Sequence, residues 1–466
     1  MEILILRHSG GNRASVEPAF ERRSLPPGTV GRVIGPGESY WGMGYDEWKT
    51  HLGSTIELPA VSGASRPPHT VATRIDLSGD WRTEVPLVAD PDPGSEYGYH
   101  TGEKLRPCTR EQLIAQCTAM PATLLVWTPD SSGMVPPESV PFLVDALARA
   151  RLRRARRDLW WCSIGLVVTL TVYVAWLPAW VFRSMLVLFP AFLAVGLLGA
   201  MYDFREARRT DARAFQDARA WHRHASWVRS QPRRYTYALL GLLALVYLAQ
   251  TFAGREVSIE LAGLLKPAVW SGEAWRLLTA SLLHANFFHL WMNGAALLAV
   301  GHLVEVHSRR EHLPLVFLVS ALTGSVASLV LYPNTTSVGA SGGLMGAIGL
   351  LLVVGWRRRD SLPPGFVGTV VFSIGATAAL GLVGYAVVDN AAHLGGLTGG
   401  AALGHLLDRR GVLDPGKSAR TRVIGLLAFG VLLAGAATVS VTIHGPDADR
   451  RRQEFRQERI ERLRPG

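Results

Sequence analysis

Residues 338–349 read VGASGGLMGAIG and place Ser341 in a glycine-rich turn, at the start of an apolar run that continues to Trp356. An uncharged run of this kind is typical of a helix that lies in lipid or inside a membrane-embedded bundle. The first backbone N–H groups of a helix have no partner within it, so they can bind an anion beside the serine hydroxyl. The stretch therefore predicts a membrane bundle with a serine of chemical interest at the N-terminus of one helix.

Composition and charge agree with a membrane protein. Of the 466 residues, 48% are hydrophobic, and the net charge is +11. The arginines cluster at the ends of apolar runs, which is the pattern of cytoplasmic helix ends and favours membrane lipids, not nucleic acid, as the partner of the basic charge. The three cysteines are scattered and predict neither a disulfide framework nor a metal site. The arginine clusters lie at residues 151–157, 203–234, 357–359 and 409–422.

Nine apolar runs predict membrane helices. The first two, joined near Phe182 and Arg183, predict a transmembrane hairpin. The half-apolar connection at residues 253–283 suits the membrane–water interface better than a crossing. The nine runs cover residues 159–181, 185–202, 237–252, 287–306, 313–332, 341–356, 366–388, 390–407 and 423–443.

These runs divide the chain into five predicted segments. The first is a small soluble α+β domain, because it is rich in proline and glycine and has no run of membrane length. Within it we expect strands at 1–6 and 124–127, a helix at 110–117, and a helix over 139–157 that leads into the membrane. The segments are residues 1–150 (cytoplasmic domain of unknown role), 151–202 (transmembrane hairpin), 203–234 (solvated basic cytoplasmic linker), 235–410 (catalytic core) and 411–466 (C-terminal transmembrane helix and basic tail).

The arginine clusters also predict the topology. They place residues 1–150 and the linker in the cytoplasm, and the opening at Ser341 on the opposite side. The last span then puts the C-terminal tail outside, although that tail is basic; Glu454, Glu458 and Glu461 lower its net charge. The heavy use of arginine over lysine suggests a GC-rich bacterial genome, so we expect the multi-pass protein in a bacterial cell membrane, with residues 1–150 cytoplasmic.

A later apolar run supplies the base that a serine nucleophile needs. A serine hydroxyl is a weak nucleophile on its own, and His393 in AAHLGGLTGG (residues 391–400) can activate it. Glycines recur every four residues on both runs, and such stripes let two membrane helices pack closely. We therefore expect the hydroxyl and the imidazole to come within reach of one another. The stripes are Gly342 and Gly346 on the first run, and Gly396, Gly400 and Gly404 on the second.

Polar residues on another run strengthen the case for a site. His289 and Asn293 lie four residues apart, on one face of the helix predicted from residue 287, and His284 stands just before it. Ionisable and amide side chains are costly in hydrocarbon and usually mark function or a paired contact. Hydrogen bonding between helices would explain each residue alone. Together with Ser341 and His393 they indicate a site.

At this point the residues resemble a known family. The chain from about 237 to 407 resembles the rhomboid intramembrane serine proteases, in four motifs that occur in the expected order. They are Trp275–Arg276, the HxxxxHxxxN of His284, His289 and Asn293, the GxSG of residues 339–342, and the AHxxGxxxG of residues 392–400.

The resemblance implies a rhomboid-like bundle of six core helices plus one C-terminal span, and it implies roles. Ser341 would be the nucleophile and His393 the general base, a dyad without a third carboxylate. His289, Asn293 and the backbone N–H of Ser341 would form the oxyanion hole. The other matched residues would support the site structurally: His284, Trp275, Arg276, Glu305, Gly339, Gly342, Gly396 and Gly400.

The same resemblance implies a serine endopeptidase that cleaves transmembrane segments of membrane proteins, without metal or other cofactor. Glu305 matches a family position that ties the first loop to the second core helix. One residue departs from the family pattern: Met345 stands where an aromatic side chain often stacks on the histidine. A thioether can also contact an imidazole.

Two alternatives use the same residues. GASGG fits the nucleophile elbow of α/β-hydrolases, with Asp389 before His393, but that motif needs a strand before the serine and a series of βαβ units. The chain instead has a helix-length run and a short polar loop there. The second alternative is a catalytically inactive rhomboid-like protein that binds or escorts membrane clients. Ser341, His393 and the small Ala340 favour the active form.

Overall fold

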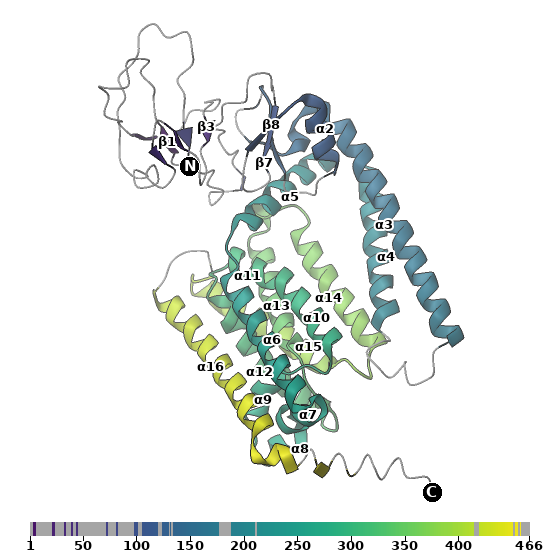
Figure 1. Ribbon diagram of the computed structural model, residues 1–466, viewed down its shortest axis with the longest axis vertical. Helices are drawn as coiled ribbons and strands as arrows, with labels where there is room; N and C mark the ends of the chain where they lie inside the picture. Colours follow the sequence, from purple (N-terminus) through teal and green to yellow (C-terminus); the bar gives the residue numbers. More distant parts are fainter. Residues whose placement is uncertain are drawn as a thin grey trace. The chain divides into compact units, whose positions relative to one another are not determined.

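The computed structural model describes two units of the chain (Figure 1). One comprises Met1–Trp161 with Leu198–Gln231, and the other comprises Cys162–Leu197 with Pro232–Gly466. The described residues are 3–5, 21–23, 32–33, 39–40, 43–44, 71–72, 81–82, 97–100, 105–119, 124–129, 131, 134–176, 188–209, 212–413, 419–450, 453–454 and 457.

The first unit contains a three-stranded antiparallel sheet in the order β8-β7-β9. The strands are β7 (Tyr97–His100), β8 (Leu105–Cys108) and β9 (Leu125–Trp127), and helix α2 (Arg110–Ala119) follows β8. Leu113, Val126 and Leu143 are fully buried in its core. The predicted α+β character, the helix near 110–117 and the strand near 124–127 are therefore confirmed.

Shorter strand pairs precede this sheet. The predicted strand at 1–6 is present as β1, which pairs antiparallel with β2. The other pairs are β3 with β6 and β4 with β5. Their bounds are β1 Ile3–Ile5, β2 Glu21–Arg23, β3 Arg32–Val33, β4 Ser39–Tyr40, β5 Met43–Gly44 and β6 Val71–Ala72.

The segment predicted as a solvated linker is largely helical and partly buried. After α4 (Leu188–Ala207) the chain forms α5 (Ala212–Ser230). In α5, the His222 ring lies 2.6 Å from the carbonyl oxygen of Leu124 and 3.2 Å from the Glu138 carboxylate. One face of α5 therefore packs against the α+β unit. The many arginines on the rest of the helix led to the prediction that the whole segment is solvated.

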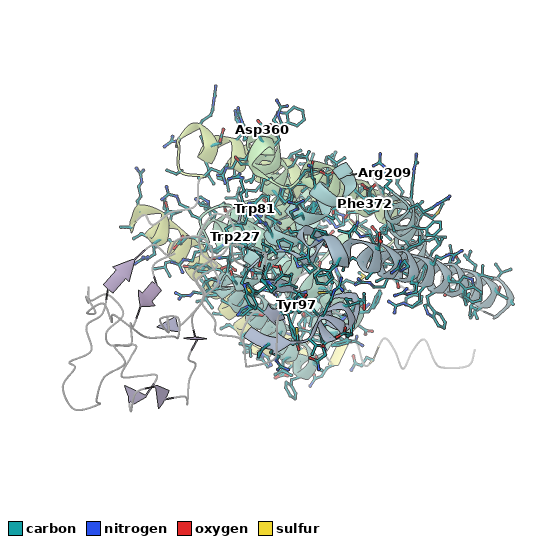
Figure 2. The ribbon with its side chains drawn as sticks, turned by 90° about the horizontal axis from the view of Figure 1, so that it is seen from above. Trp81, Tyr97, Arg209, Trp227, Asp360 and Phe372 are labelled. Carbon is teal, nitrogen blue, oxygen red and sulfur yellow. The ribbon has the colours of Figure 1, made fainter. Side chains whose placement is uncertain are left out.

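His224 is the other buried histidine of α5. Its ring lies 5.5 Å from the ring of Trp81 and 6.0 Å from that of Trp227, two side chains labelled near one another in Figure 2. Burial lowers the pKa of His224 to about 4, so the imidazole is neutral at physiological pH. The residue acts here as an aromatic member of the core.

Every one of the nine predicted apolar runs forms a helix, so the polytopic all-α fold is confirmed. Seven of these helices are long and apolar enough to cross a membrane. The other two are α13 and α15, which carry Ser341 and His393. The helices are α3 (Pro141–Trp176), α4, α6 (Arg234–Ala253), α10 to α11 (Phe287–His307), α12 (His312–Leu331), α13 (Ser341–Arg357), α14 (Phe366–Val383), α15 (Asn390–Arg409) and α16 (Ala419–His444).

The boundaries differ from the prediction in two places. The connection predicted near Phe182 and Arg183 lies outside the described residues. The run at 366–388 forms a shorter helix, since α14 ends at Val383 and Gly384 begins a turn that leads to α15. The residues after that turn place Asp389 directly before α15.

The connection between α6 and α10 is structured throughout. It contains α7 (Arg255–Ala262), β10 (Leu264–Leu265), α8 (Lys266–Trp270), α9 (Arg276–Thr279) and a 3-10 turn at Ala280–Leu282. Strand β10 pairs antiparallel with β11 (Thr336–Ser337). The sequence indicates only a loop before Ser341, and a pairing of two residues with two is too short to leave a pattern in it.

Candidate active site

Arg276 holds the loop between α6 and α10 together. Its guanidinium donates hydrogen bonds to the carbonyl oxygens of Glu260 and Gly263, both at 2.9 Å, and to the Glu273 carboxylate at 2.7 Å. It also lies 4.9 Å from the centre of the Trp275 ring. A guanidinium has five N–H donors in a fixed planar arrangement, so one arginine can bind several backbone and side-chain oxygens of the loop at once. Arg276 and Trp275 thus occupy positions consistent with the structural support expected of them.

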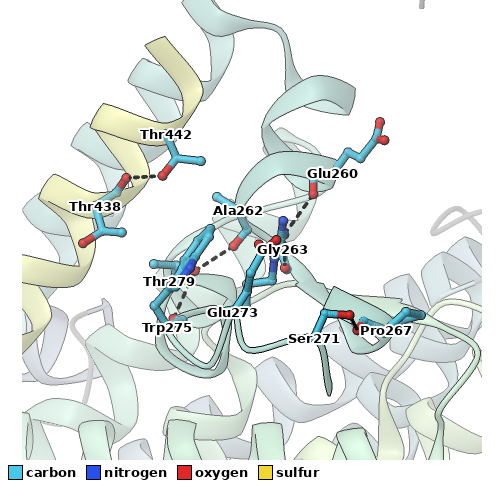
Figure 3. Close-up of polar contacts among 11 residues, drawn as sticks. Glu260, Ala262, Gly263, Pro267, Ser271, Glu273, Trp275, Thr279, Thr438 and Thr442 are labelled. Carbon is cyan, nitrogen blue, oxygen red and sulfur yellow. Dashed lines mark hydrogen bonds and ion pairs between the residues drawn. The ribbon is translucent and has the colours of Figure 1, made fainter. Parts of the chain in front are cut away.

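Thr279 adds a second closure of the same loop. Its hydroxyl donates to the carbonyl oxygen of Ala262 at 2.8 Å, and the carbonyl oxygen of Trp275 lies 3.4 Å away (Figure 3). Thr279 is 1% exposed. The loop is therefore fixed by buried polar contacts on both sides of α8.

His284 lies behind His289. Their ring centres are 5.2 Å apart in an edge-to-face arrangement, and both side chains are buried. The backbone N–H of His284 donates to Gln250 Oε1 at 2.9 Å, and Gln250 Nε2 donates to the carbonyl oxygen of His284 at 3.3 Å. Gln250, fully buried on α6, thus fixes the position of His284.

Asn286 positions the helix that carries His289 and Asn293. Its side chain caps α10 (Phe287–Ala296) by accepting a hydrogen bond from the backbone N–H of His289 at 2.8 Å. His289 Nδ1 and Asn293 Nδ2 are buried and have no hydrogen-bond partner in the described part of the chain. Since a buried polar group without a partner costs free energy, these two atoms call for an explanation.

The turn before Ser341 brings the serine close to these side chains. Gly339 has φ = +130°, a conformation that L side chains rarely adopt. A Cβ at this position would lie 2.6 Å from Cε1 of His289. The backbone N–H of Gly339 donates to the carbonyl oxygen of Ala280 at 2.9 Å. Glycine at position 339 therefore permits the approach of the His289 ring to the turn.

The predicted glycine seam joins α13 to α15. A Cβ at Gly396 would overlap the carbonyl oxygen of Gly342, and one at Gly400 would overlap that of Gly346. Gly342 itself has ordinary space, with the nearest atom 3.5 Å from a Cβ built on it. The close approach thus depends on the glycines of α15 more than on Gly342.

His393 lies in the first turn of α15. Its Nδ1 is buried and has no hydrogen-bond partner among the described residues. The Asp389 carboxylate, four residues earlier, accepts from the backbone N–H of Ala392 at 2.9 Å and from the hydroxyl of Ser337 at 2.6 Å. His393 Nδ1 donates no hydrogen bond to Asp389 in the described part of the chain, so these residues do not form the Ser-His-Asp arrangement of the hydrolase alternative.

Ser341, His393, His289 and Asn293 all line one cavity of about 910 Å³. The rest of the lining is mostly apolar. It comes from α10, α13, α14, the first two turns of α4 and the segments before α13 and α15, and it includes Phe288, Met292, Leu344, Met345, Leu380 and Leu188. The structure thus brings the four predicted chemical residues together at one hollow in an apolar bundle.

Glu305 differs from its expected role. Its carboxylate accepts hydrogen bonds from the backbone N–H of Thr236 at 2.7 Å, from the Thr236 hydroxyl at 2.6 Å and from the backbone N–H of Tyr235 at 3.2 Å. It caps the N-terminus of α6, where unpaired N–H groups and the helix dipole favour an anion. The expected tie between Glu305 and the loop at 253–283 is therefore corrected: the partner is α6.

Three polar residues of this region were not singled out in the sequence. Gln250 and Lys266 are fully buried, and Ser328 donates a hydrogen bond to Asp389. A single glutamine, lysine or serine carries no motif, and their partners lie far along the chain. The only signal was the cost of a polar residue within or beside an apolar run.

Known proteins that are similar in sequence to this chain belong to one family. The Rhomboid domain matches residues 271–410. The chain is 33% identical to Rhomboid protease GluP of Bacillus subtilis over 210 residues, which cover 43% of this chain and 38% of that protein. It is 36% identical to RHOMBOID-like protein 6, mitochondrial, of Arabidopsis thaliana (30% of this chain, 46% of the relative) and 29% identical to Rhomboid-like protease 1 of Toxoplasma gondii (39% and 62%).

Each of these alignments covers less than two thirds of the relative's own length. The Rhomboid match and the seven apolar helices support a multi-pass membrane protein. Because the relatives come from a bacterium, a plant and Toxoplasma gondii, they do not favour the predicted bacterial membrane over another. The matched residues 271–410 include the candidate site residues described above: Trp275, Arg276, His284, His289, Asn293, Glu305, Ser341 and His393. Over residues 271–410, the chain therefore carries a Rhomboid domain.

Proposed function

We propose that this protein is an intramembrane serine endopeptidase, in which Ser341 is the nucleophile and His393 the general base. Two of the relatives described above are named proteases, which supports a hydrolase of the protease kind. One observation carries the finer proposal. His289, Asn293 and His393 each have a buried side-chain nitrogen without a hydrogen-bond partner among the described residues, and all three line the same apolar cavity as Ser341. Such atoms are costly to a fold, and a site is a physical reason to keep them.

The chemistry follows from these positions. Ser341 Oγ attacks the carbonyl carbon of the scissile peptide bond while the His393 imidazole takes its proton. Asn293 Nδ2, His289 and the backbone N–H of Ser341 donate to the oxygen on which negative charge develops. The imidazolium then protonates the leaving amine, and water hydrolyses the acyl-enzyme by the same route in reverse. Because the cavity is mostly apolar, these donors act with little competition from solvent.

The substrate class follows from backbone physics. A helix in lipid satisfies all its backbone hydrogen bonds internally, so it must unwind before its backbone can enter a protease site. Substrates are therefore transmembrane segments that carry glycine or proline near the cut, since these residues weaken the helix. The surrounding lipid is the second partner of the protein.

The test uses the purified full-length chain in liposomes with a transmembrane substrate. Ser341→Ala and His393→Ala should each lower cleavage at least about a thousandfold, because the two residues act as a unit. The same substrate with its glycine and proline residues replaced by leucine should be cut more slowly by the wild type. Thermal unfolding of each variant serves as the control for folding.

Two outcomes would contradict the proposal. Cleavage by Ser341→Ala at a comparable rate would remove the assigned nucleophile. Binding of the transmembrane segment by the wild type with no cleavage would instead favour the alternative, an inactive rhomboid-like protein that holds membrane clients.

A further inference from the structure

Lys266 is a buried cation that the proposed reaction does not use. It lies at the junction of β10 and α8 and is 0% exposed. Its ammonium donates to the hydroxyl of Ser337 at 2.6 Å and to that of Thr335 at 3.1 Å. Burial lowers the pKa of Lys266, and the nearby Asp389 carboxylate acts in the opposite direction. An ammonium in this position needs a compensating charge.

Ser337 connects Lys266 to that charge. Its hydroxyl accepts from Lys266 and donates to Asp389 Oδ2 at 2.6 Å. Ser328, fully buried on α12, donates to the same carboxylate oxygen. Hydrogen bonds with an ionised partner are the stronger ones, and a chain of them between two opposite charges is mutually polarising.

Asp389 in turn fixes the start of the helix that carries His393. Its Oδ1 accepts from the backbone N–H of Ala392 at 2.9 Å, which caps α15. Its backbone carbonyl accepts from the N–H of His393 itself at 3.1 Å. Both groups of one residue therefore set the first turn of α15.

The other end of the chain of hydrogen bonds lies next to the serine. Ser337 is the last residue of β11, four residues before Ser341, and β11 is held by its pairing with β10. One buried ammonium thus holds both the strand that leads to Ser341 and the carboxylate that caps the His393 helix.

We propose that Lys266, Ser337 and Asp389, the Lys266–Ser337–Asp389 bridge, position His393 relative to Ser341. None of the three is a catalytic residue, since they act through the first turn of α15 and through β11. The inference rests on the proposed function, because it assigns these residues to the alignment of that dyad. It connects the loop between α6 and α10, through Ser337 and Asp389, to the first turn of the helix that carries His393.

Thr335 provides a matched control for Ser337. Both hydroxyls accept from Lys266, but only that of Ser337 continues to Asp389. Ser337→Ala should break the bridge, Thr335→Ala should leave it connected, and Ser337→Thr should restore it by returning a hydroxyl. Asp389→Asn keeps an oxygen for the α15 cap but removes the charge.

The measurement is the rate at which a small fluorophosphonate labels the serine of the full-length protein. This reagent bonds to Oγ and loses fluoride, so it reports on the alignment of serine and base without requiring a transmembrane segment to bind. Ser337→Ala and Asp389→Asn should be labelled about ten- to a hundredfold more slowly, since a displacement of about 1 Å can cost about a hundredfold. With a transmembrane substrate, kcat should fall by a similar factor and KM should change little. Thr335→Ala should lose less than about threefold, and Ser337→Thr should approach the wild type.

The outcomes separate this inference from the proposed function. If the wild type and Ser341→Ala are labelled equally, the proposed function fails and the inference fails with it. If Ser341→Ala is not labelled and folded Ser337→Ala is labelled at the wild-type rate, the bridge has no positioning role. A lower unfolding temperature with an unchanged labelling rate per folded molecule would likewise reduce the bridge to a structural contact.

Discussion

Helices α13 and α14 follow each other in the chain and both border the cavity, yet they are packed in opposite ways. Of the 17 residues of α13, 12 are buried, whereas of the 18 residues of α14 only Phe366, Val370 and Gly381 are buried. Phe372, labelled in Figure 2, is 48% exposed on α14. The helix that carries the serine is thus held on all sides, and its neighbour at the cavity is held by little protein.

Glycines at the contact between α13 and α15 and glycines of α14 differ in how closely neighbouring atoms approach them. Gly396 and Gly400 of α15 contact the backbone of α13 so closely that no Cβ fits, while Gly368 and Gly375 of α14 have no atom within 4 Å of a built Cβ. A glycine in a membrane helix can therefore lie in close contact with another helix, or it can face open space where a larger side chain would also fit. The comparison teaches that close packing is concentrated around Ser341 and His393, the residues of the proposed dyad.

The largest effect is expected from breaking the seam. Gly396→Val would force α13 and α15 apart at the carbonyl of Gly342, so cleavage should fall at least about a hundredfold because the dyad is displaced. Gly375→Val is the matched control on α14 and should keep cleavage within about threefold, since a Cβ built at this position has no atom within 4 Å. Cleavage in liposomes and thermal unfolding in detergent measure the two effects. Equal loss in both variants would mean that the seam is not special.

The next effect concerns the donors at the cavity. Asn293→Ala should lower kcat about a hundred- to a thousandfold, as expected for one oxyanion donor, with KM nearly unchanged. The unpartnered Nδ2 of Asn293 motivates this expectation. Steady-state kinetics with a transmembrane substrate decides the matter. A rise in KM at constant kcat would make Asn293 a binding residue.

The smallest effect compares two phenylalanines. Phe317 of α12 is 0% exposed and lies against Gly343 of α13, so Phe317→Ala should destabilise the bundle by about 3–5 kcal/mol. Phe372→Ala on α14 should change stability by less than about 0.5 kcal/mol. Unfolding of the two variants in the same detergent provides the comparison. A cost at Phe372 as large as that at Phe317 would show that α14 is packed as firmly as the core.

The sequence predicted the parts of this molecule that repeat or cluster along the chain. The nine apolar runs gave the helices, and the four-residue glycine spacing gave the seam between α13 and α15. The sequence did not predict pairs of single polar residues. Gln250 and His284 are 34 residues apart, and Lys266 and Ser337 are 71 apart. Nothing local distinguishes such a lysine from an ordinary interfacial one, because its burial is decided by strands β10 and β11 meeting.

Glu305 and α5 illustrate a second limit of the sequence. The position of Glu305 was expected from a family pattern, but its partner depends on which helix N-terminus lies beside it, and here that is α6. In α5 the arginines dominate the composition, while His222 and His224 are buried against the α+β unit. Charge counts describe the exposed face of a helix and say little about the other face.

The unpartnered atoms at the cavity also affect the stability of the whole molecule. His393 Nδ1, His289 Nδ1 and Asn293 Nδ2 are buried without partners in the described chain, and each such atom typically costs a fold about 1–3 kcal/mol. A selection for heat resistance alone would therefore favour replacing these side chains with apolar ones, and under the proposed function it would remove the activity at the same time. The proposed site thus lowers the heat resistance of the bundle, while the close contacts of Gly396 and Gly400 hold α13 and α15 together beside it.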